Sequence, residues 1–417
     1  MHLKCLFLVV LFTTTSPLVR AQQALSDTIT LRDAINATLE ANPRLRSFPL
    51  LEEALAGERE TADLNPAFRV NSNVENVLGT GSLGDFSATE LNLSLSQVVE
   101  MGDKRTIRVN VINRKFDLLN TERRVTELDL LGEVVRRFID VASAQERWAL
   151  QQQATAISSQ TIELLTPLVD AGQTPQLELN RAQAALIRAR TAEQAAASYL
   201  EDSRLRLSNM WAVNSPQFEG VSSDFLAVGQ SNSIESILSD VESNPNIEIF
   251  ADESRLLEAE LRQAQAKQQG DIEWSAGVRH LRELNDTGFV FGVSIPLMSK
   301  SRASGNIRTT RANLQEVEIR RATSLNRLIG EISSLHKQLL QAISEVDSLR
   351  SEVIPLLNSA MQDTREAYLA GGYSYLELIS AQQEYLDAQF ALINSATNAH
   401  KFRAEIERLS GQPLPSQ

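Results

Sequence analysis

Two stretches of the sequence resemble each other and decide the fold: residues 171–183 read AGQTPQLELNRAQ, and residues 370–382 read AGGYSYLELISAQ. The pairs Ala-Gly and Ala-Gln and the triplet Leu-Glu-Leu recur in the same order, each 199 positions on. Glycine favours a tight turn at a helix end, and residues typical of helices follow it in both stretches. Each stretch therefore predicts the turn of a helical hairpin, and the likeness indicates an internal duplication.

The duplication extends beyond these turns. Asn42-Pro43 recurs as Asn244-Pro245, 202 positions on, and Ser96 in LSLSQVVEMG recurs as Ser294 in FGVSIPLMS, 198 positions on. This period is far longer than that of solenoid repeats. We therefore expect two repeats, at about residues 22–215 and 230–417, joined by a loop rich in Ser, Gly and Asn.

Long helices precede both turns, at about residues 103–170 and 301–370. In the second, ten apolar residues alternate in steps of three and four, which is typical of a coiled-coil seam. They are Leu325, Leu328, Ile332, Leu335, Leu339, Ala342, Val346, Leu349, Val353 and Leu356. At ~1.5 Å per residue each helical span would reach about 100 Å. Pro167 and Pro355 should bend or interrupt them.

Four segments alternate apolar and polar residues with a period of two and predict β-hairpins at about residues 67–99 and 271–298. Barrel strands show this pattern, and so do ordinary hairpins packed on helices, so periodicity leaves both readings open. Four strands cannot close a barrel, and an open sheet edge cannot face lipid. Two copies would give eight strands around a filled interior, whereas three would give twelve around an aqueous lumen. The strand count favours a trimer if the protein is a conduit.

The first residues have the pattern of a secretory signal. A basic residue, Lys4, precedes the short apolar run Cys5–Phe12, and small residues precede a cleavage site after Ala21. We expect residues 1–21 to be removed. The net charge of −13 then becomes −15, because two basic residues and no acid are lost.

Composition excludes several classes. The only cysteine, Cys5, leaves with the signal, so we expect neither a lipid anchor nor a disulfide. A negative net charge argues against nucleic acid as a partner. No later run reaches ~18 apolar residues, so no membrane-spanning helix is expected.

Candidate chemical sites are weak. The glycines at positions 79, 81 and 84 match a dinucleotide-binding pattern, but a strand rather than a helix follows them, which favours a hairpin loop. The histidines His280, His336 and His400 lie far apart and lack ligand spacing. We assign no catalytic residue, cofactor or metal site and expect no enzyme.

Three stretches carry a resemblance to a known family: TLRDAINATLEANP at 30–43, SQVVEMGDKR at 96–105 and AYLAGGYSYLELISAQQEYLDAQ at 367–389. Together with the duplicated plan they resemble the TolC-like outer membrane efflux proteins, or outer membrane factors, and especially the cobalt-zinc-cadmium type. The chain departs from that pattern at Val98, where the family has a proline. It also lacks the cysteine that anchors many relatives to lipid.

The resemblance implies a mainly α fold with a transmembrane β part. In a homotrimer, four strands per chain would form a shared twelve-stranded barrel, and the helices would form a long periplasmic α-helical barrel. The chain would lie in the outer membrane, in contact with its lipid, with a large periplasmic portion. It would serve as the exit duct of a tripartite efflux system, with a periplasmic adaptor (membrane fusion protein) and an inner-membrane pump of the RND type.

The same resemblance slightly favours metal cations as cargo. A duct for drugs or for type I secretion stays open as an alternative, as does a protein of another class, a periplasmic coiled-coil adaptor or scaffold. The alternating strands argue against the adaptor, because an adaptor has no need of apolar faces turned to lipid.

Glu178 and Glu377 are the first candidate site, because they occupy equivalent positions just after the two turns. Three copies would place six carboxylates in one ring, and the family has an acidic constriction at the position of Glu377. Such a ring would favour cations. The alternative is that both are ordinary solvated helix residues.

The turns themselves are the second candidate site, for docking of the adaptor. The residues are Gly172, Gln173, Thr174, Gly371, Gly372 and Tyr373. The alternative is that the glycines serve only the tight turn.

Overall fold

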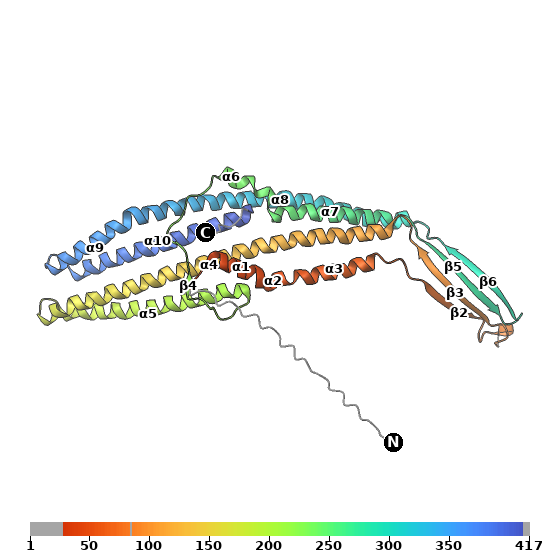
Figure 1. The fold of residues 1–417 in the computed structure, drawn as a ribbon, viewed down its shortest axis with the longest axis horizontal. Coiled ribbons are helices and arrows are strands. Elements are labelled where there is room, and N and C mark those ends of the chain that lie inside the picture. The colour runs from red at the N-terminus through yellow and green to blue at the C-terminus, as the bar shows by residue number, and fades with distance from the viewer. Residues whose placement is uncertain (1–27, 84–85, 412–417) are drawn as a thin grey trace, which may run out of the picture.

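The computed structural model describes residues 28–83 and 86–411, and the predicted signal sequence lies outside them. The molecule is elongated (Figure 1): a β-sheet forms one end, long helices form the body, and two helical hairpins form the other end. The mainly helical class expected from the sequence is confirmed.

The chain builds this shape in two passes. The first contains β1 (Thr28–Ile29), α1 (Leu31–Ala41), α2 (Pro43–Arg46), α3 (Phe48–Ala62), β2 (Arg69–Glu75), β3 (Glu90–Val99), α4 (Lys104–Asp170) and α5 (Gln176–Ser208). The second contains β4 (Gly220–Val221), α6 (Ile234–Ser239), α7 (Pro245–Ala266), β5 (Ile272–Leu281), β6 (Asp286–Ser294), α8 (Ser299–Ser348), a π-helix (Leu349–Val353), α9 (Ile354–Leu369) and α10 (Tyr375–Ser410). Short 3-10 turns lie at Gly81–Leu83, Asn209–Trp211 and Val241–Ser243.

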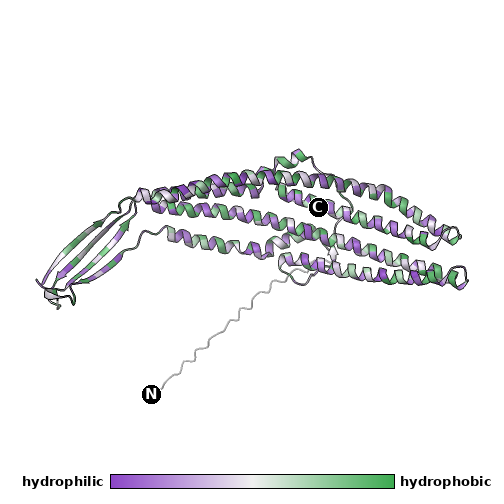
Figure 2. Cartoon of the chain, turned by 180° about the vertical axis from the view of Figure 1, so that it is seen from behind, coloured by the Kyte–Doolittle hydropathy of each residue, from purple (hydrophilic) through white to green (hydrophobic). Residues whose placement is uncertain are grey.

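The four long strands form one antiparallel sheet in the order β2-β3-β5-β6. Its register places Val70, Leu95, Ala276 and Phe291 side by side across the sheet. Apolar and polar residues alternate along each strand (Figure 2). The apolar side chains are exposed to a high degree, up to 82% at Phe289. A large uncovered apolar surface of this kind marks an interaction site for lipid or protein.

The helices bury the seam predicted in α8. Leu328, Ile332, Leu339 and Ala342 are buried in one cluster with residues of α6 and α10. The seam helix therefore packs against the returning helix α10 rather than standing alone. Among the described residues, no helix is long and apolar enough to cross a membrane.

The end of the predicted seam is wrong. Val353 and Leu356 are 37% and 71% exposed, and the half-buried residues are instead Ile354 and Leu357, one residue later. The π-helix Leu349–Val353 causes this shift, because its wider turn contains an additional residue. It ends two residues before Pro355, which has no N–H to donate to the preceding turn and whose ring would clash with a regular helix there.

The expectation that Pro167 would bend or interrupt its helix is wrong in part, because α4 runs without a break through Pro167 to Asp170. Pro167 lies in the last turn of α4, where one missing backbone hydrogen bond has little helix left to disturb.

The two Asn-Pro pairs make equivalent joints. Asn42 caps α2 by accepting from the Arg44 N–H (2.9 Å), and its amide donates to the Met210 carbonyl (2.7 Å) after α5. Asn244 caps α7 by accepting from the Asn246 N–H (2.8 Å). Both asparagines are buried, so each satisfies backbone groups that water cannot reach.

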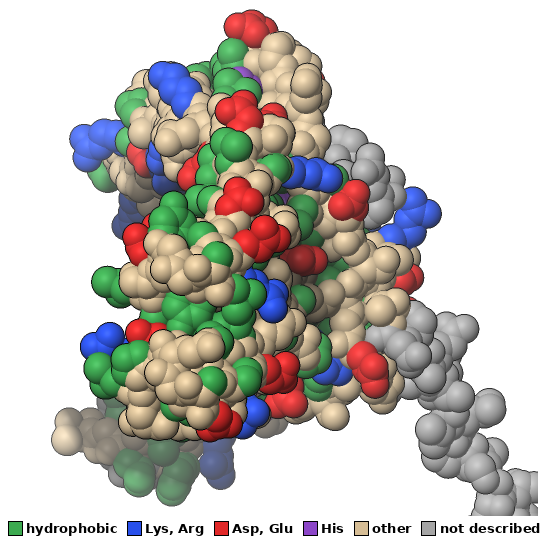
Figure 3. Space-filling model, turned by 90° about the vertical axis from the view of Figure 1, so that its left-hand side faces the viewer, with side chains coloured by type: hydrophobic (Ala, Val, Ile, Leu, Met, Phe, Trp, Pro, Cys, Tyr) green, Lys and Arg blue, Asp and Glu red, His purple; other side chains and the backbone are tan. Residues whose placement is uncertain are grey.

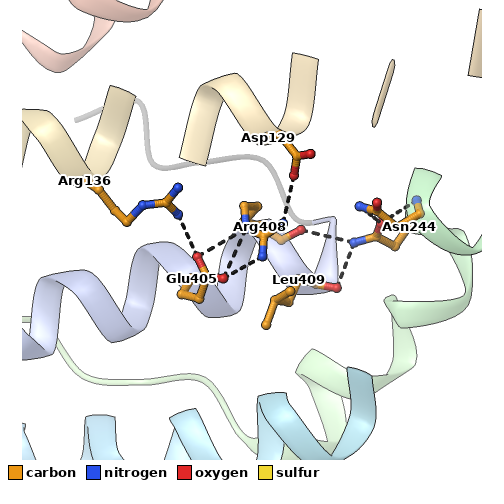
Figure 4. A network of polar contacts seen from close by, with 7 residues as sticks. Asp129, Arg136, Asn244, Glu405, Arg408 and Leu409 are labelled. Atoms are coloured by element: carbon orange, nitrogen blue, oxygen red, sulfur yellow. Dashed lines mark hydrogen bonds and ion pairs between the residues drawn. The ribbon is translucent and has the colours of Figure 1, made fainter. Parts of the chain in front are cut away.

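Asn244 also holds the end of α10. Its amide donates to the carbonyls of Leu409 (2.7 Å) and Arg408 (3.1 Å), as Figure 4 shows. The Arg408 guanidinium contacts Asp129 of α4 (2.9 Å) and Glu405 (2.6 Å). Burial would raise the pKa of Glu405, but Arg408 and a second arginine, Arg136, outweigh it and lower that pKa. This network ties α10 to α4 and α7.

Candidate functional site

The two helical hairpins end side by side at the end of the molecule opposite the sheet (Figure 1). One hairpin is α4 with α5, and the other is α9 with α10. Figure 3 looks onto this end, where hydrophobic side chains lie among acidic and basic ones. The predicted site residues of both repeats therefore meet in one region of the molecule.

The first turn requires its glycine. Gly172 has a positive φ of 66°, a conformation that other residues rarely adopt. The N–H groups of Gly172 and Gln173 donate to the carbonyls of Val169 (2.9 Å) and Leu168 (2.8 Å) at the end of α4. Gln173 is exposed and Thr174 is half-buried. The turn thus closes the α4 terminus and leaves the Gln173 side chain exposed.

The second turn needs only one of its two glycines. Gly371 has a positive φ of 76°. Gly372 does not have a positive φ, and a Cβ there would make only an ordinary van der Waals contact with the Ala367 carbonyl. The Gly372 N–H donates to the Ala367 carbonyl (2.9 Å). Tyr373 is 50% exposed. The structure would therefore accommodate a side chain at position 372, and neither the backbone conformation nor the available space requires a glycine there.

An apolar cluster joins the two hairpins near their turns. It contains Leu165, Leu179 and Ala182 from the first hairpin, and Tyr368, Tyr375 and Leu378 from the second. A side-chain hydrogen bond from Gln382 to Thr161 (3.1 Å) lies beside it. The tips of one chain are thereby held together.

Glu178 lies at this junction. It is half-buried, and the Tyr368 hydroxyl donates to its carboxylate (3.0 Å). Burial raises the pKa of Tyr368, and the charge of Glu178 raises it further, although a hydrogen bond with Thr174 acts in the opposite direction. Glu178 therefore has a structural partner from the other hairpin.

Glu377 has a different environment, although it occupies the equivalent repeat position. It is exposed, and it forms a capping box with Ser374 at the start of α10: the Ser374 N–H donates to its carboxylate (2.6 Å). This backbone hydrogen bond lowers the pKa of Glu377. The two carboxylates near the tip are thus held by different neighbours.

Sequence reasoning did not assign a role to Tyr368 and Tyr375. Both lie in the stretch AYLAGGYSY of the second repeat, and the first repeat has Val169 and Gln176 in their places. This asymmetry between the repeats was the available signal. Aromatic residues that replace aliphatic or polar ones in one copy indicate a contact that the other copy does not make.

Two of the three histidines in the described residues contact backbone carbonyls, and the third, His280, lies 3.2 Å from the Thr287 hydroxyl. The Nε2 atoms of His336 and His400 lie 3.0 Å from the Asn232 carbonyl and 2.8 Å from the Phe225 carbonyl. Burial lowers the pKa of His400. Among the described residues, no group of three or more His, Cys, Asp or Glu side chains is arranged to hold a metal ion.

A family model described as outer membrane efflux protein matches residues 34–213. The cobalt-zinc-cadmium resistance protein CzcC of Cupriavidus metallidurans is 22% identical over 314 residues, which cover 75% of each chain. The nickel-cobalt-cadmium resistance protein NccC of Alcaligenes xylosoxydans is 24% identical over 281 residues, which cover 66% of this chain and 63% of that protein.

Among solved structures, CusC matches with a TM-score of 0.74 at 15% identity, over 92% of each chain. The CusC structures concern the folding of that protein and its formation of a transmembrane channel. At this identity the match shows the fold. The match covers most of the chain, and the resemblance noted on the sequence is confirmed. Residues 34–213 therefore form an outer membrane efflux protein domain, and the chain has the fold of the TolC-like outer-membrane channels.

Proposed function

We propose that three copies of this chain form the exit duct of a tripartite efflux system in the outer membrane. The observation that carries the proposal is the four-stranded sheet, which has an exposed apolar face and two outer strands, β2 and β6. Among the described residues, no further strand pairs with either outer edge. Open edges cannot remain in lipid, so the sheet needs further copies to close a barrel. Three copies supply twelve strands and a water-filled lumen.

The helical body suits the periplasmic part of such a duct. α4 alone has 67 residues, which at ~1.5 Å per residue spans on the order of 100 Å. With the sheet in the outer membrane, the hairpin tips would reach far into the periplasm. The two repeats of each chain would contribute equally to the tube, as expected from an internal duplication.

The tips are the proposed contact with a periplasmic adaptor. Leu177 and Leu376 occupy equivalent repeat positions just after the turns and are 58% and 72% exposed. Tyr373 and Gln173 are exposed beside them. Exposed apolar residues rimmed by polar ones suit the docking of a helical partner. The adaptor would connect the duct to an inner-membrane pump of the RND type.

Metal cations are the proposed cargo, because the relatives CzcC and NccC are named for resistance to cobalt, zinc, cadmium and nickel. Deletion of the gene should increase sensitivity to these cations and leave sensitivity to organic drugs unchanged. Increased sensitivity to drugs alone would favour the drug duct.

Glu178 and Glu377 are the proposed acidic ring of the periplasmic mouth. Six carboxylates from three copies would attract cations and repel anions. Replacement of both by Gln keeps the side-chain volume and removes the charge. In planar bilayers, the double variant should lose cation selectivity and be blocked less by multivalent cations. The control is Glu316→Gln, an exposed acid on α8 far from the tips. Unchanged selectivity in the double variant would refute the ring, and a monomeric mass in detergent would refute the duct.

A further inference from the structure

Two helices next to the sheet each leave one face uncovered. Near its start, α8 packs through Ala303 and Ile307 against α7. The opposite side of α8 contains the exposed residues Gly305 and Ala312. The helix α3 packs through Phe48 against the main core. The free side of α3 contains two exposed residues, Leu50 and Gly57. A Cβ at Gly57, or at Gly305 of α8, would meet only open space.

The two free faces have opposite charges. Residues 299–311, at the start of α8, contain four basic residues and no acid, in a chain with a net charge of −13. The helix α3 contains four glutamates and one arginine. Within the described residues, no ion pair involves Arg302 or Arg308 of α8, or Glu53 or Glu60 of α3.

The equivalent basic segment of the first repeat behaves differently. Lys104 at the start of α4 pairs with Asp271 (2.6 Å), and Arg105 pairs with Asp63 (3.7 Å). Arg108 pairs with a third acid of the same chain, Glu100. The first repeat thus neutralises its basic segment within the chain, whereas in the second repeat no basic residue of the segment 299–311 has an ion-pair partner among the described residues. This asymmetry indicates that the partners of α8 come from elsewhere.

Closure of the sheet would bring the two faces together. The strands alternate in direction, so β6 of one copy can continue the antiparallel pattern with β2 of the next. β6 ends and β2 begins at the end of the sheet that adjoins the helices (Figure 1). The helix α8 follows β6, and α3 precedes β2. These two helices would therefore lie next to each other, antiparallel, in neighbouring copies.

We propose that the free face of α3 in one copy packs on the free face of α8 in the next copy, with Gly57 against Gly305 and with ion pairs Glu60–Arg302 and Glu53–Arg308. This inference rests on the proposed trimer and adds the residues that fix its register. The two glycines allow close approach of the helices. Charges of opposite sign oppose a slipped arrangement.

The distance of each pair from its helix ends agrees. Glu53 lies nine residues before the end of α3 at Ala62, and Arg308 lies nine residues after the start of α8 at Ser299. At ~1.5 Å per residue both are about 14 Å from their helix ends. By the same count, Gly57 lies about 8 Å and Gly305 about 9 Å from those ends. Leu50 would then meet Ala312.

The spacing places each set on one side of its helix. Residues 302, 305, 308 and 312 on α8, and residues 50, 53, 57 and 60 on α3, are separated by steps of three and four. Residues three and four apart are neighbours on a helix surface. The proposed contact therefore forms a continuous stripe on both helices.

Cysteine cross-linking tests the register directly. The only cysteine of the sequence is Cys5, in the predicted signal, so new cysteines would have no competitor in the processed chain. The variant with Glu53→Cys and Arg308→Cys, oxidised in outer-membrane vesicles, should give disulfide-linked dimers and trimers on a non-reducing gel. The matched control combines Glu53→Cys with Arg327→Cys, an exposed position 19 residues further along α8, or about 28 Å away.

The outcomes separate this inference from the proposed duct. A trimeric mass in detergent without more cross-linking than the control would overturn the α3–α8 contact and leave the duct intact. A monomeric mass would overturn both. Cross-linking well above the control in a trimer supports the contact.

A charge swap provides the second test. Arg302→Glu with Arg308→Glu should lower the temperature at which the trimer dissociates, and adding Glu53→Arg with Glu60→Arg should restore it. The basic segment could instead bind an anionic lipid surface. In that case the swap would fail to restore stability, and phosphatidylglycerol vesicles would stabilise the original chain but not the Arg302→Glu, Arg308→Glu variant. That result would overturn the proposal.

Discussion

Asn244→Ala should be one of the most destabilising single polar substitutions in the helical body. Asn244 is 0% exposed; it accepts the Asn246 N–H at the start of α7 and donates to the Leu409 and Arg408 carbonyls at the end of α10. Loss of an N-cap costs about 1 kcal/mol. A buried polar group left without a partner costs about 1–3 kcal/mol. The two carbonyls lie in the last turn of α10, where intrahelical partners are missing, so we expect a total loss of about 2–4 kcal/mol.

The assay is denaturant unfolding in detergent, followed by circular dichroism. The matched comparison is Asn42→Ala, which removes one cap and a single bond to the Met210 carbonyl and should cost less, about 1.5–3 kcal/mol. Asn313→Ala, at an exposed position of α8, should stay within about 0.5 kcal/mol. Equal, small effects of Asn244→Ala and Asn313→Ala would refute the joint as a stabilising contact.

Three further outcomes are expected. Leu335→Asp should destabilise the chain by about 2–4 kcal/mol, because Leu335 packs against the α8 seam cluster; an unchanged melting temperature and trimer yield would show that the seam does not carry the packing. Ser374→Ala should raise the pKa of Glu377, because the Ser374 hydroxyl helps to lower it; a carboxyl-labelled NMR titration measures this, and an unmoved pKa would contradict the cap. Burial raises the pKa of Glu407 from 4.5 to about 7, so its contribution to stability is present below about 4.5 and lost as the pH rises through about 7. Between pH ~5 and ~7 the free energy of unfolding should therefore fall more steeply in the original chain than in Glu407→Gln, and parallel curves would assign the dependence to other groups.

Periodicity was sufficient to predict the mainly helical class and the alternating strands. The apolar row through Val70, Leu95, Ala276 and Phe291 was visible as alternation in each segment. The order of the strands was not predictable in the same way, because it depends on contacts between segments nearly two hundred residues apart, such as that of Leu95 with Ala276. Local patterns determine which face is apolar, and tertiary pairing determines the neighbours.

The candidate acids illustrate the same limit. Equivalent repeat positions suggested equal roles for Glu178 and Glu377. Glu377 caps its own helix because a serine lies three residues before it, a pattern that the sequence contains as S-x-x-E. Glu178 has Pro175 at that position, which offers no side-chain cap, and its carboxylate turns to Tyr368 of the other hairpin. The cap was readable from the sequence, whereas the contact with Tyr368 depends on how the hairpins pack.

The π-helix at Leu349–Val353 has a consequence for exchanging hairpin tips between channels of this fold. One residue advances an α-helix by about 100°, so the additional residue rotates everything beyond it relative to the shaft of α8. A chimera that is joined by matching heptads, without regard to this turn, would present the side of Leu356 where the side of Leu357 belongs. The grafted hairpin would then face its neighbours with the wrong surface, although every residue in it was native. Junctions placed before Leu349 or after Val353, with the whole π-helix taken from one parent, preserve the orientation of the tip.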